Sequence, residues 1–177
     1  WTRQGDQSGG FWQVEDEERA VVCNLTEAPT FFVSPNEYFE MTLRGTLEVE
    51  VLGDDDIVGV VFGYQSPLMS QGDDPWDVRA FVLSWKQAEE DAEGVTSPAG
   101  VTLGYLSGQI PVDQIERVFW GMEPTMVHTP IATYHGPGAG WRDNVEHDFA
   151  LSYGAQGIRV ALDGQKIFDL DAAEVGA

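Results

Sequence analysis

Three consecutive carboxylates, Asp54, Asp55 and Asp56, run directly into the apolar segment 57–65. Adjacent negative charges repel one another, so a folded chain that holds them together needs a compensating cation. Carboxylate oxygens suit Ca²⁺, which takes about six to eight oxygen ligands at roughly 2.3–2.6 Å. The triplet therefore predicts a calcium site. The alternative is a solvated acidic turn between two strands.

A second acidic group lies in the segment 71–77, where Asp73, Asp74 and Asp77 predict another cation site. The alternative for this group is a solvated loop. A further acidic run, 89–93, is interpreted as a solvated face or a mobile loop.

The charge balance limits the partners of the chain. Its 177 residues include 30 Asp and Glu against nine Lys and Arg, a formal net charge of -21. Such a surface repels nucleic acid and anionic membranes, so we expect no nucleic-acid partner. No apolar run approaches the ~18 residues that span a bilayer, so we expect no membrane insertion. The lone Cys23 excludes an internal disulfide.

Alternating and apolar runs predict strands along most of the chain. The segment 46–51 alternates, and 58–64 is a denser run that predicts a central strand covered on both faces. Asp163 and Gly164 join two alternating runs, 157–162 and 165–170, which predicts a β-hairpin. Further strands are expected at 80–85 and 148–153, and a two-turn helix at 111–119 that begins with Pro111. The pattern predicts an all-β, antiparallel β-sandwich in one domain, 1–177.

Aromatic side chains beside acidic loops are a feature of calcium-dependent sugar sites. Trp76 and Trp141 lie in or near segments rich in Gly and Pro, and Trp141 is followed by Arg142 and Asp143. These four residues are the candidate ligand-binding residues. For Trp141 the alternative, a ring that caps the end of the sandwich core, stays open.

Signals for catalysis are absent from the sequence. None of its three His residues forms the i, i+4 pair of a helical zinc site, and there is no Gly-x-Ser-x-Gly turn. The acids at 15–18 and at Glu48 and Glu50 lack the Glu-x-Asp-x-Glu spacing of sandwich glucanases. We therefore expect no enzymatic activity, with a glycoside hydrolase as the least favoured alternative.

The order of several short motifs resembles the thrombospondin C-terminal domain, a jelly-roll β-sandwich related to the legume-type lectins of the concanavalin fold. The matching pieces are Asp-Asp-Asp at 54–56, Gly-Val-Val-Phe-Gly-Tyr-Gln at 59–65, Trp-Lys-Gln at 85–87, and the segments 29–34, 133–136, 140–143 and 157–160. The resemblance implies an extracellular, calcium-stabilised, non-enzymatic module for adhesion or matrix contacts. It also implies that Asp54, Asp55 and Asp56 contribute to a calcium site.

The chain also departs from the family pattern. Its segment 66–79 is longer than expected, and the family continues past the last hairpin with an aromatic-rich closing strand, whereas this sequence ends at Ala177. Either that strand has been trimmed away, or the domain is split and completed elsewhere in a parent protein. The acidity and the lack of disulfides resemble a bacterial surface-adhesin version of the domain.

The sequence thus predicts a calcium-stabilised structural or adhesion module, excised from a larger cell-surface or secreted protein. Its expected partners are neighbouring domains of the same polypeptide, and glycans or another surface protein. The alternative function is a calcium-dependent, carbohydrate-binding lectin domain.

Overall fold

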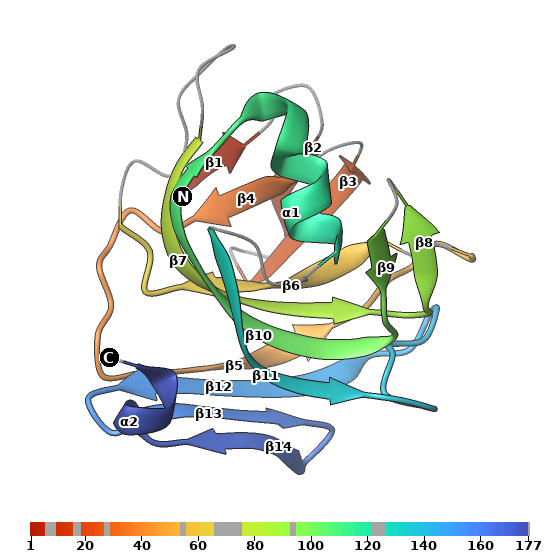
Figure 1. Ribbon diagram of the computed structural model, residues 1–177. Coiled ribbons are helices and arrows are strands. Elements are labelled where there is room, and N and C mark those ends of the chain that lie inside the picture. The colour runs from red at the N-terminus through yellow and green to blue at the C-terminus, as the bar shows by residue number, and fades with distance from the viewer. Residues whose placement is uncertain are drawn as a thin grey trace.

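The computed structural model describes residues 1–5, 10–15, 19–26, 29–53, 56–65, 76–92, 95–121 and 127–176. Within these residues the chain forms two four-stranded antiparallel sheets, stacked as layers, with smaller elements on the outer side of one of them (Figure 1). The predicted antiparallel β-sandwich is confirmed.

The first layer, the β7 sheet, has the strand order β11-β10-β7-β6. Its strands are β6 (Ile57–Phe62), β7 (Trp76–Lys86), β10 (Gly100–Ile110) and β11 (His128–His135). The second layer, the β13 sheet, has the order β14-β13-β12-β5. Its strands are β5 (Met41–Leu47), β12 (His147–Gly154), β13 (Gly157–Leu162) and β14 (Gln165–Leu170).

Three two-stranded sheets and three short helical segments complete the described fold. β1 (Thr2–Gly5) pairs with β4 (Thr30–Val33), β2 (Gly10–Glu15) with β3 (Ala20–Thr26), and β8 (Glu90–Ala92) with β9 (Val95–Ser97). The helical segments are the 3₁₀ helix η2 (Val112–Gln114), α1 (Ile115–Gly121) and α2 (Ala172–Val175).

The β7 sheet is covered on both faces because its strands alternate between two apolar clusters. In β7, Phe81, Leu83 and Trp85 pack in the main core against Leu151 and Val160 of the β13 sheet. The intervening side chains of β7, Val78, Ala80 and Val82, face a second cluster on the outer side of the sheet. This cluster also includes Ile115 and Val118 of α1. Burial on both faces explains why β7 is apolar at the four consecutive positions 80–83 rather than at every second one.

The predicted hairpin at Asp163 and Gly164 is confirmed, and its turn explains both residue types. Leu162 pairs with Gln165 across the turn. The φ angles of Asp163 and Gly164 are 48° and 76°, so both lie in the left-handed region that a type I′ turn requires. Asp and Gly are residues that adopt this region most readily.

Two of the strand expectations need correction. The strand expected at 46–51 ends at Leu47, and Val51 is 60% exposed. Of the described strands β6 pairs only with β7, so it lies at the edge of its sheet and not at the centre. In the run 89–93, Glu89 and Asp91 are exposed, as the solvated-face interpretation predicts, and residues 90–92 form the short strand β8. Glu90 forms an ion pair with Lys86 at 3.0 Å. Alternation alone does not reveal how many neighbours a strand has.

The helix expected at 111–119 begins later than predicted. Pro111 lies before the helix rather than at its first position, and its carbonyl accepts a hydrogen bond from the amide of Gln114 at 2.9 Å. The segment then continues as η2 and α1, which ends at Gly121. Ile115 and Val118 bury their side chains on the β7 sheet, so tertiary packing holds this short helix in place.

Candidate functional site

The Trp-Arg-Asp motif at 141–143 lies at the end of the sandwich where β6 begins and β7 ends. Ile57, which directly follows Asp56, pairs with Lys86. The side chain of Trp141 forms a hydrogen bond with Trp85, and the side chain of Asp143 forms one with Gln87. We call the segment 139–147 and the residues that it contacts the Trp141 end.

The ring of Trp141 belongs to the core. It is 2% exposed, and its indole N–H donates to the carbonyl of Trp85 at 3.2 Å. Trp85 in turn donates its own indole N–H to the carbonyl of Ala139 at 2.7 Å. Of the two alternatives for Trp141, the structure therefore shows the ring that caps the core. A side chain at Gly140 would place its Cβ 1.9 Å from the carbonyl oxygen of Gln87, so this close approach requires glycine.

Asp143 connects two segments that are far apart in the sequence. One carboxylate oxygen accepts a hydrogen bond from the side-chain amide of Gln87 at 2.9 Å, and the other from the backbone N–H of Gly53 at 3.1 Å. The amide of Asn144 donates to the carbonyl of Val49 at 2.8 Å. The turn that leads into the acidic triplet is therefore attached to the Trp141 end by two hydrogen bonds.

His147 is a residue that the sequence analysis did not select. Its ring is 3% exposed, packs edge-on against Trp85 with ring centroids 4.8 Å apart, and accepts at Nε2 from the amide of Arg142 at 3.3 Å. Nδ1 therefore carries the proton, and it donates to Asp163 at 2.8 Å. The pair links the Trp141 end to the turn of the β13–β14 hairpin, a contact for which the sequence offers no signal.

The pKa of Asp163 lies below its usual value. Partial burial alone would raise the pKa. Hydrogen bonds from His147 and from the amide of Asp148, with the electrostatic influence of His147 and Arg142, outweigh this effect and stabilise the carboxylate. Asp163 is therefore ionised at neutral pH.

An open depression of about 660 Å³ lies on the surface of the Trp141 end. Its lining residues include Gly136, Pro137, Gly138, Gly140 and Pro98, and among its polar lining residues are Gln87, Glu89, His135 and Arg142. Burial lowers the pKa of His135, whose Nε2 lies 2.8 Å from the hydroxyl of Thr102. A neutral imidazole, an amide, one cation and one anion can exchange hydrogen bonds with an uncharged polar ligand.

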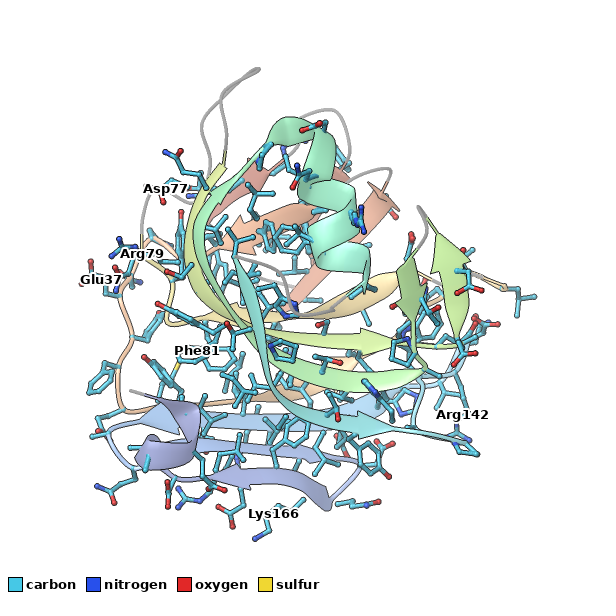
Figure 2. The ribbon with its side chains drawn as sticks, in the orientation of Figure 1. Glu37, Asp77, Arg79, Phe81, Arg142 and Lys166 are labelled. Atoms are coloured by element: carbon cyan, nitrogen blue, oxygen red, sulfur yellow. The ribbon has the colours of Figure 1, made fainter. Side chains whose placement is uncertain are left out.

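The predicted acidic sites are only partly covered by the structure. Asp54, Asp55, Asp73 and Asp74 lie outside the described residues. Asp56 is half-buried before β6, and Asp77 is exposed at the second position of β7. Because Ile57 pairs with Lys86, nine residues beyond Asp77, the two acids are separated by about 30 Å of strand. They therefore belong to different ends of the molecule, as Figure 2 also shows for Asp77 and Arg142.

The same separation applies to the candidate aromatic residues. Trp76 begins β7, whereas Trp141 contacts Trp85 near the end of that strand, so the two do not form one site. The ring of Trp76 lies outside the described part of the structure. In the described ranges no three or more His, Cys, Asp or Glu residues form a group that could hold a metal ion. Calcium binding and ligand binding by the predicted residues both stay predictions.

The fold and the order of the motifs agree with a family match. The model of the thrombospondin C-terminal region matches residues 7–175. The chain belongs to the thrombospondin C-terminal family. It is 22% identical to human cartilage oligomeric matrix protein over 151 residues, and 25% identical to thrombospondin-2 of Gallus gallus over 177 residues. These matches cover 82% and 89% of the chain.

The chain spans less than one fifth of the curated relatives it matches, 19% of cartilage oligomeric matrix protein and 14% of the Gallus gallus thrombospondin-2. The first of these relatives is by name a matrix protein, and the family membership confirms the predicted extracellular location. Among the described helices, none has the length and apolar character needed to cross a membrane.

Proposed function

We propose that this domain of the thrombospondin C-terminal family is a calcium-stabilised, non-enzymatic module that serves structure or adhesion in a larger extracellular protein. The observation that carries the proposal is the set of hydrogen bonds by which Asp143 and Asn144 hold the turn before the acidic triplet. Its partners are neighbouring domains of the same polypeptide or another surface protein. The small share of the relatives' length that the chain covers supports this role.

The calcium ion would be held by Asp54, Asp55 and Asp56. Their donor chemistry fits, because carboxylate oxygens are the ligands that Ca²⁺ prefers. The ion would neutralise part of the formal net charge of -21 and relieve the repulsion among three adjacent acids. Asp56 is half-buried, and its backbone position is constrained because the next residue, Ile57, pairs with Lys86 in the sheet.

The test is thermal unfolding of chelator-treated protein, with and without millimolar Ca²⁺ and with Mg²⁺ as the control ion. A ligand at about 100 times its dissociation constant stabilises the folded state by roughly 2.7 kcal/mol. We expect a calcium-specific rise of the midpoint that is lost on changing Asp54, Asp55 or Asp56 to Asn. The matched control is Asp169→Asn, which makes the same charge change at an exposed ion pair with Lys166. An unchanged wild-type midpoint contradicts the calcium role.

A second candidate function, a calcium-dependent lectin, is favoured by the depression at the Trp141 end. Its mixture of Glu89, Gln87, Arg142 and neutral His135 offers donors and acceptors to saccharide hydroxyls, beside the apolar surface of Pro98. A glycan array distinguishes this candidate from a pure scaffold, which binds no glycan. Arg142→Ala should abolish glycan retention because it removes a hydrogen-bond donor from the depression, and it should leave the core intact because Arg142 is exposed. Arg117→Ala removes an exposed cation on α1, outside the depression, and should not affect retention.

A further inference from the structure

The outer strands of the two sheets differ in how they are protected against pairing with another chain. The edge of a sheet presents unpaired backbone N–H and C=O groups, and proteins commonly protect it with charged side chains, proline or bulges. β11 contains Pro130, and its pairing with β10 shifts register between Leu103 and Gly104. β14 carries Lys166 and Asp169, which form an ion pair. Both of these edges are therefore protected.

β5, at the opposite edge of the β13 sheet, has little protection of this kind. Of the described strands it pairs with β12 alone. The chain contains 30 Asp and Glu, yet β5 has none of them, and its one charged residue is Arg44. β6 also lies at an edge and has no charged residue, but its Val58 and Val60 pack against the main core.

Leu43 shows that the core is incompletely covered along β5. It pairs with Leu151 of β12, so both side chains point to the core face of the sheet. Leu151 is completely buried, whereas Leu43 is 38% exposed. Just before β5, the ring of Phe39 is 64% exposed and packs edge-on against Tyr153. A further strand along β5 would cover Leu43 and pair with the backbone groups of the outer edge.

Acidic residues at both ends of β5 indicate the charge of such a strand. Glu37 and Glu40 precede β5, and Glu48 and Glu50 follow it, all with exposed side chains. Figure 2 shows Glu37 on the outside of the segment that leads into β5. With Arg44 at the centre, the edge is negative, positive and negative again over about 27 Å between Glu40 and Glu48.

A second copy of this chain does not match this charge order. In an antiparallel pairing of two β5 strands centred on Arg44, the two Arg44 side chains lie opposite each other, and Glu40 lies opposite Glu48 of the second copy. Like charges directly opposite one another are destabilising. Each copy also carries a formal net charge of -21, which opposes association. The complementary strand has basic residues near both ends.

We propose that β5 is a docking edge for an extended segment of another protein, which adds to the β13 sheet as a further strand. Apolar side chains at every second position of the segment cover Leu43, and Lys or Arg near both ends meet the acids that flank β5. The main-chain hydrogen bonds supply binding, and the side-chain pattern supplies specificity. The inference rests on the adhesion part of the proposed function, for which it names the binding surface, and not on calcium.

The experiment uses the wild-type domain and a synthetic peptide as long as β5, in which Val and Thr alternate, with one Lys beyond each end. Hydrogen exchange of the backbone amides at 41–47 is measured with and without the peptide. At about ten times its dissociation constant the peptide lowers the unbound fraction about tenfold, so the amides on the outer edge should exchange about tenfold more slowly. The amides of β14 should not change. The same peptide with Pro at its centre lacks a backbone donor and should protect β5 less.

Two substitutions on β5 test the core face separately from charge. Leu43→Glu removes the apolar contact and places a charge where the new strand packs, so peptide protection should be lost. Thr42→Glu is the matched control, because it introduces the same charge at an exposed side chain on the opposite face of β5. A negative charge attracts the basic peptide at either position, so a loss in Leu43→Glu alone reports on packing. Should Leu43→Glu not fold, the comparison of the two peptides decides the question.

Other results overturn the proposal and identify the occupant. Slow exchange of the outer β5 amides in the peptide-free monomer would mean that a segment of this chain covers the edge. Slow exchange only at concentrations at which sedimentation detects a dimer would assign the edge to a second copy. An edge that neither peptide protects is not a docking site. That failure leaves the calcium-stabilised structural role standing, because thermal unfolding in Ca²⁺ measures that role separately.

Discussion

The two ends of the β13 sheet are completed in different ways. At the Trp141 end, hydrogen bonds join residues that lie 54 and 90 positions apart, such as Trp85 with Ala139 and Gly53 with Asp143. At the other end, α2 is capped by hydrogen bonds within its own segment: the Asp171 side chain accepts from the amides of Ala173 and Glu174, and the Glu174 side chain accepts from the amide of Asp171. One end is therefore built by the whole fold, and the other by a local capping box.

The side chains at the Trp141 end are also more deeply buried than those at the α2 end. Trp141 and His147 are almost fully buried, whereas α2 contains no buried residue. Changes at the Trp141 end should therefore affect the free energy of unfolding of the whole domain. Changes at the α2 end should affect mainly the short helix itself, because little apolar surface depends on it.

The largest effect is expected for Trp141→Ala. Removing a buried aromatic side chain leaves a cavity and costs about 3–5 kcal/mol of the free energy of unfolding. Chemical denaturation measures the loss. Leu52→Ala, at a side chain that is 80% exposed, should stay within about 0.5 kcal/mol of the wild type. Equal effects of the two changes would mean that the Trp141 end does not contribute to the main core.

A smaller loss is expected for His147→Phe. The phenyl ring can keep the packing against Trp85, but it removes the donor to Asp163 and the acceptor for the amide of Arg142. Each hydrogen bond lost typically costs about 0.5–1.5 kcal/mol of the free energy of unfolding. The same denaturation experiment measures it. An unchanged stability would show that the ring contributes packing alone.

At the α2 end, Asp171→Ala should cost only about 1 kcal/mol, the usual effect of losing an N-cap side chain. Asp171→Asn keeps an acceptor oxygen for the amides of Ala173 and Glu174 and should be nearly neutral. Hydrogen exchange of the α2 amides should report the change. A loss as large as that of Trp141→Ala would remove the distinction between the two ends.

The smallest effect concerns the pH dependence of Asp163. Its pKa is lowered in the folded state, so the unfolded state binds a proton more readily. The stabilisation is fully present above the unfolded pKa near 3.8, and it is lost as the pH falls through the lower folded pKa. The effect is small because the side chain is 51% exposed. In Asp163→Asn the free energy of unfolding, measured by denaturation at several pH values, should fall less steeply toward acid pH than in the wild type. An unchanged slope would mean that other carboxylates cause the loss of stability in acid.

Much of the fold was predictable because it depends on short-range pattern. The Asp163–Gly164 hairpin follows from alternation and turn chemistry, and the strands around 80–85 and 148–153 follow from short apolar runs; the structure confirms all three. The helix α2 was also within reach, since Asp171 and Glu174 have the spacing of a capping box. The edge position of β6 could not be predicted from the sequence, because an apolar strand covered on both faces has the same composition at the edge of a sheet as at its centre.

The candidate site shows the same division. The sequence by itself determined the family, the sandwich class, the charge of -21 and the residue types at 54–56 and 141–143. Only the tertiary structure decided that Trp141 is a core residue, that Asp143 holds Gly53, and that His147 pairs with Asp163. Composition and alternation are properties of neighbouring residues. A hydrogen bond between residues 90 positions apart exists only once the strands between them have paired.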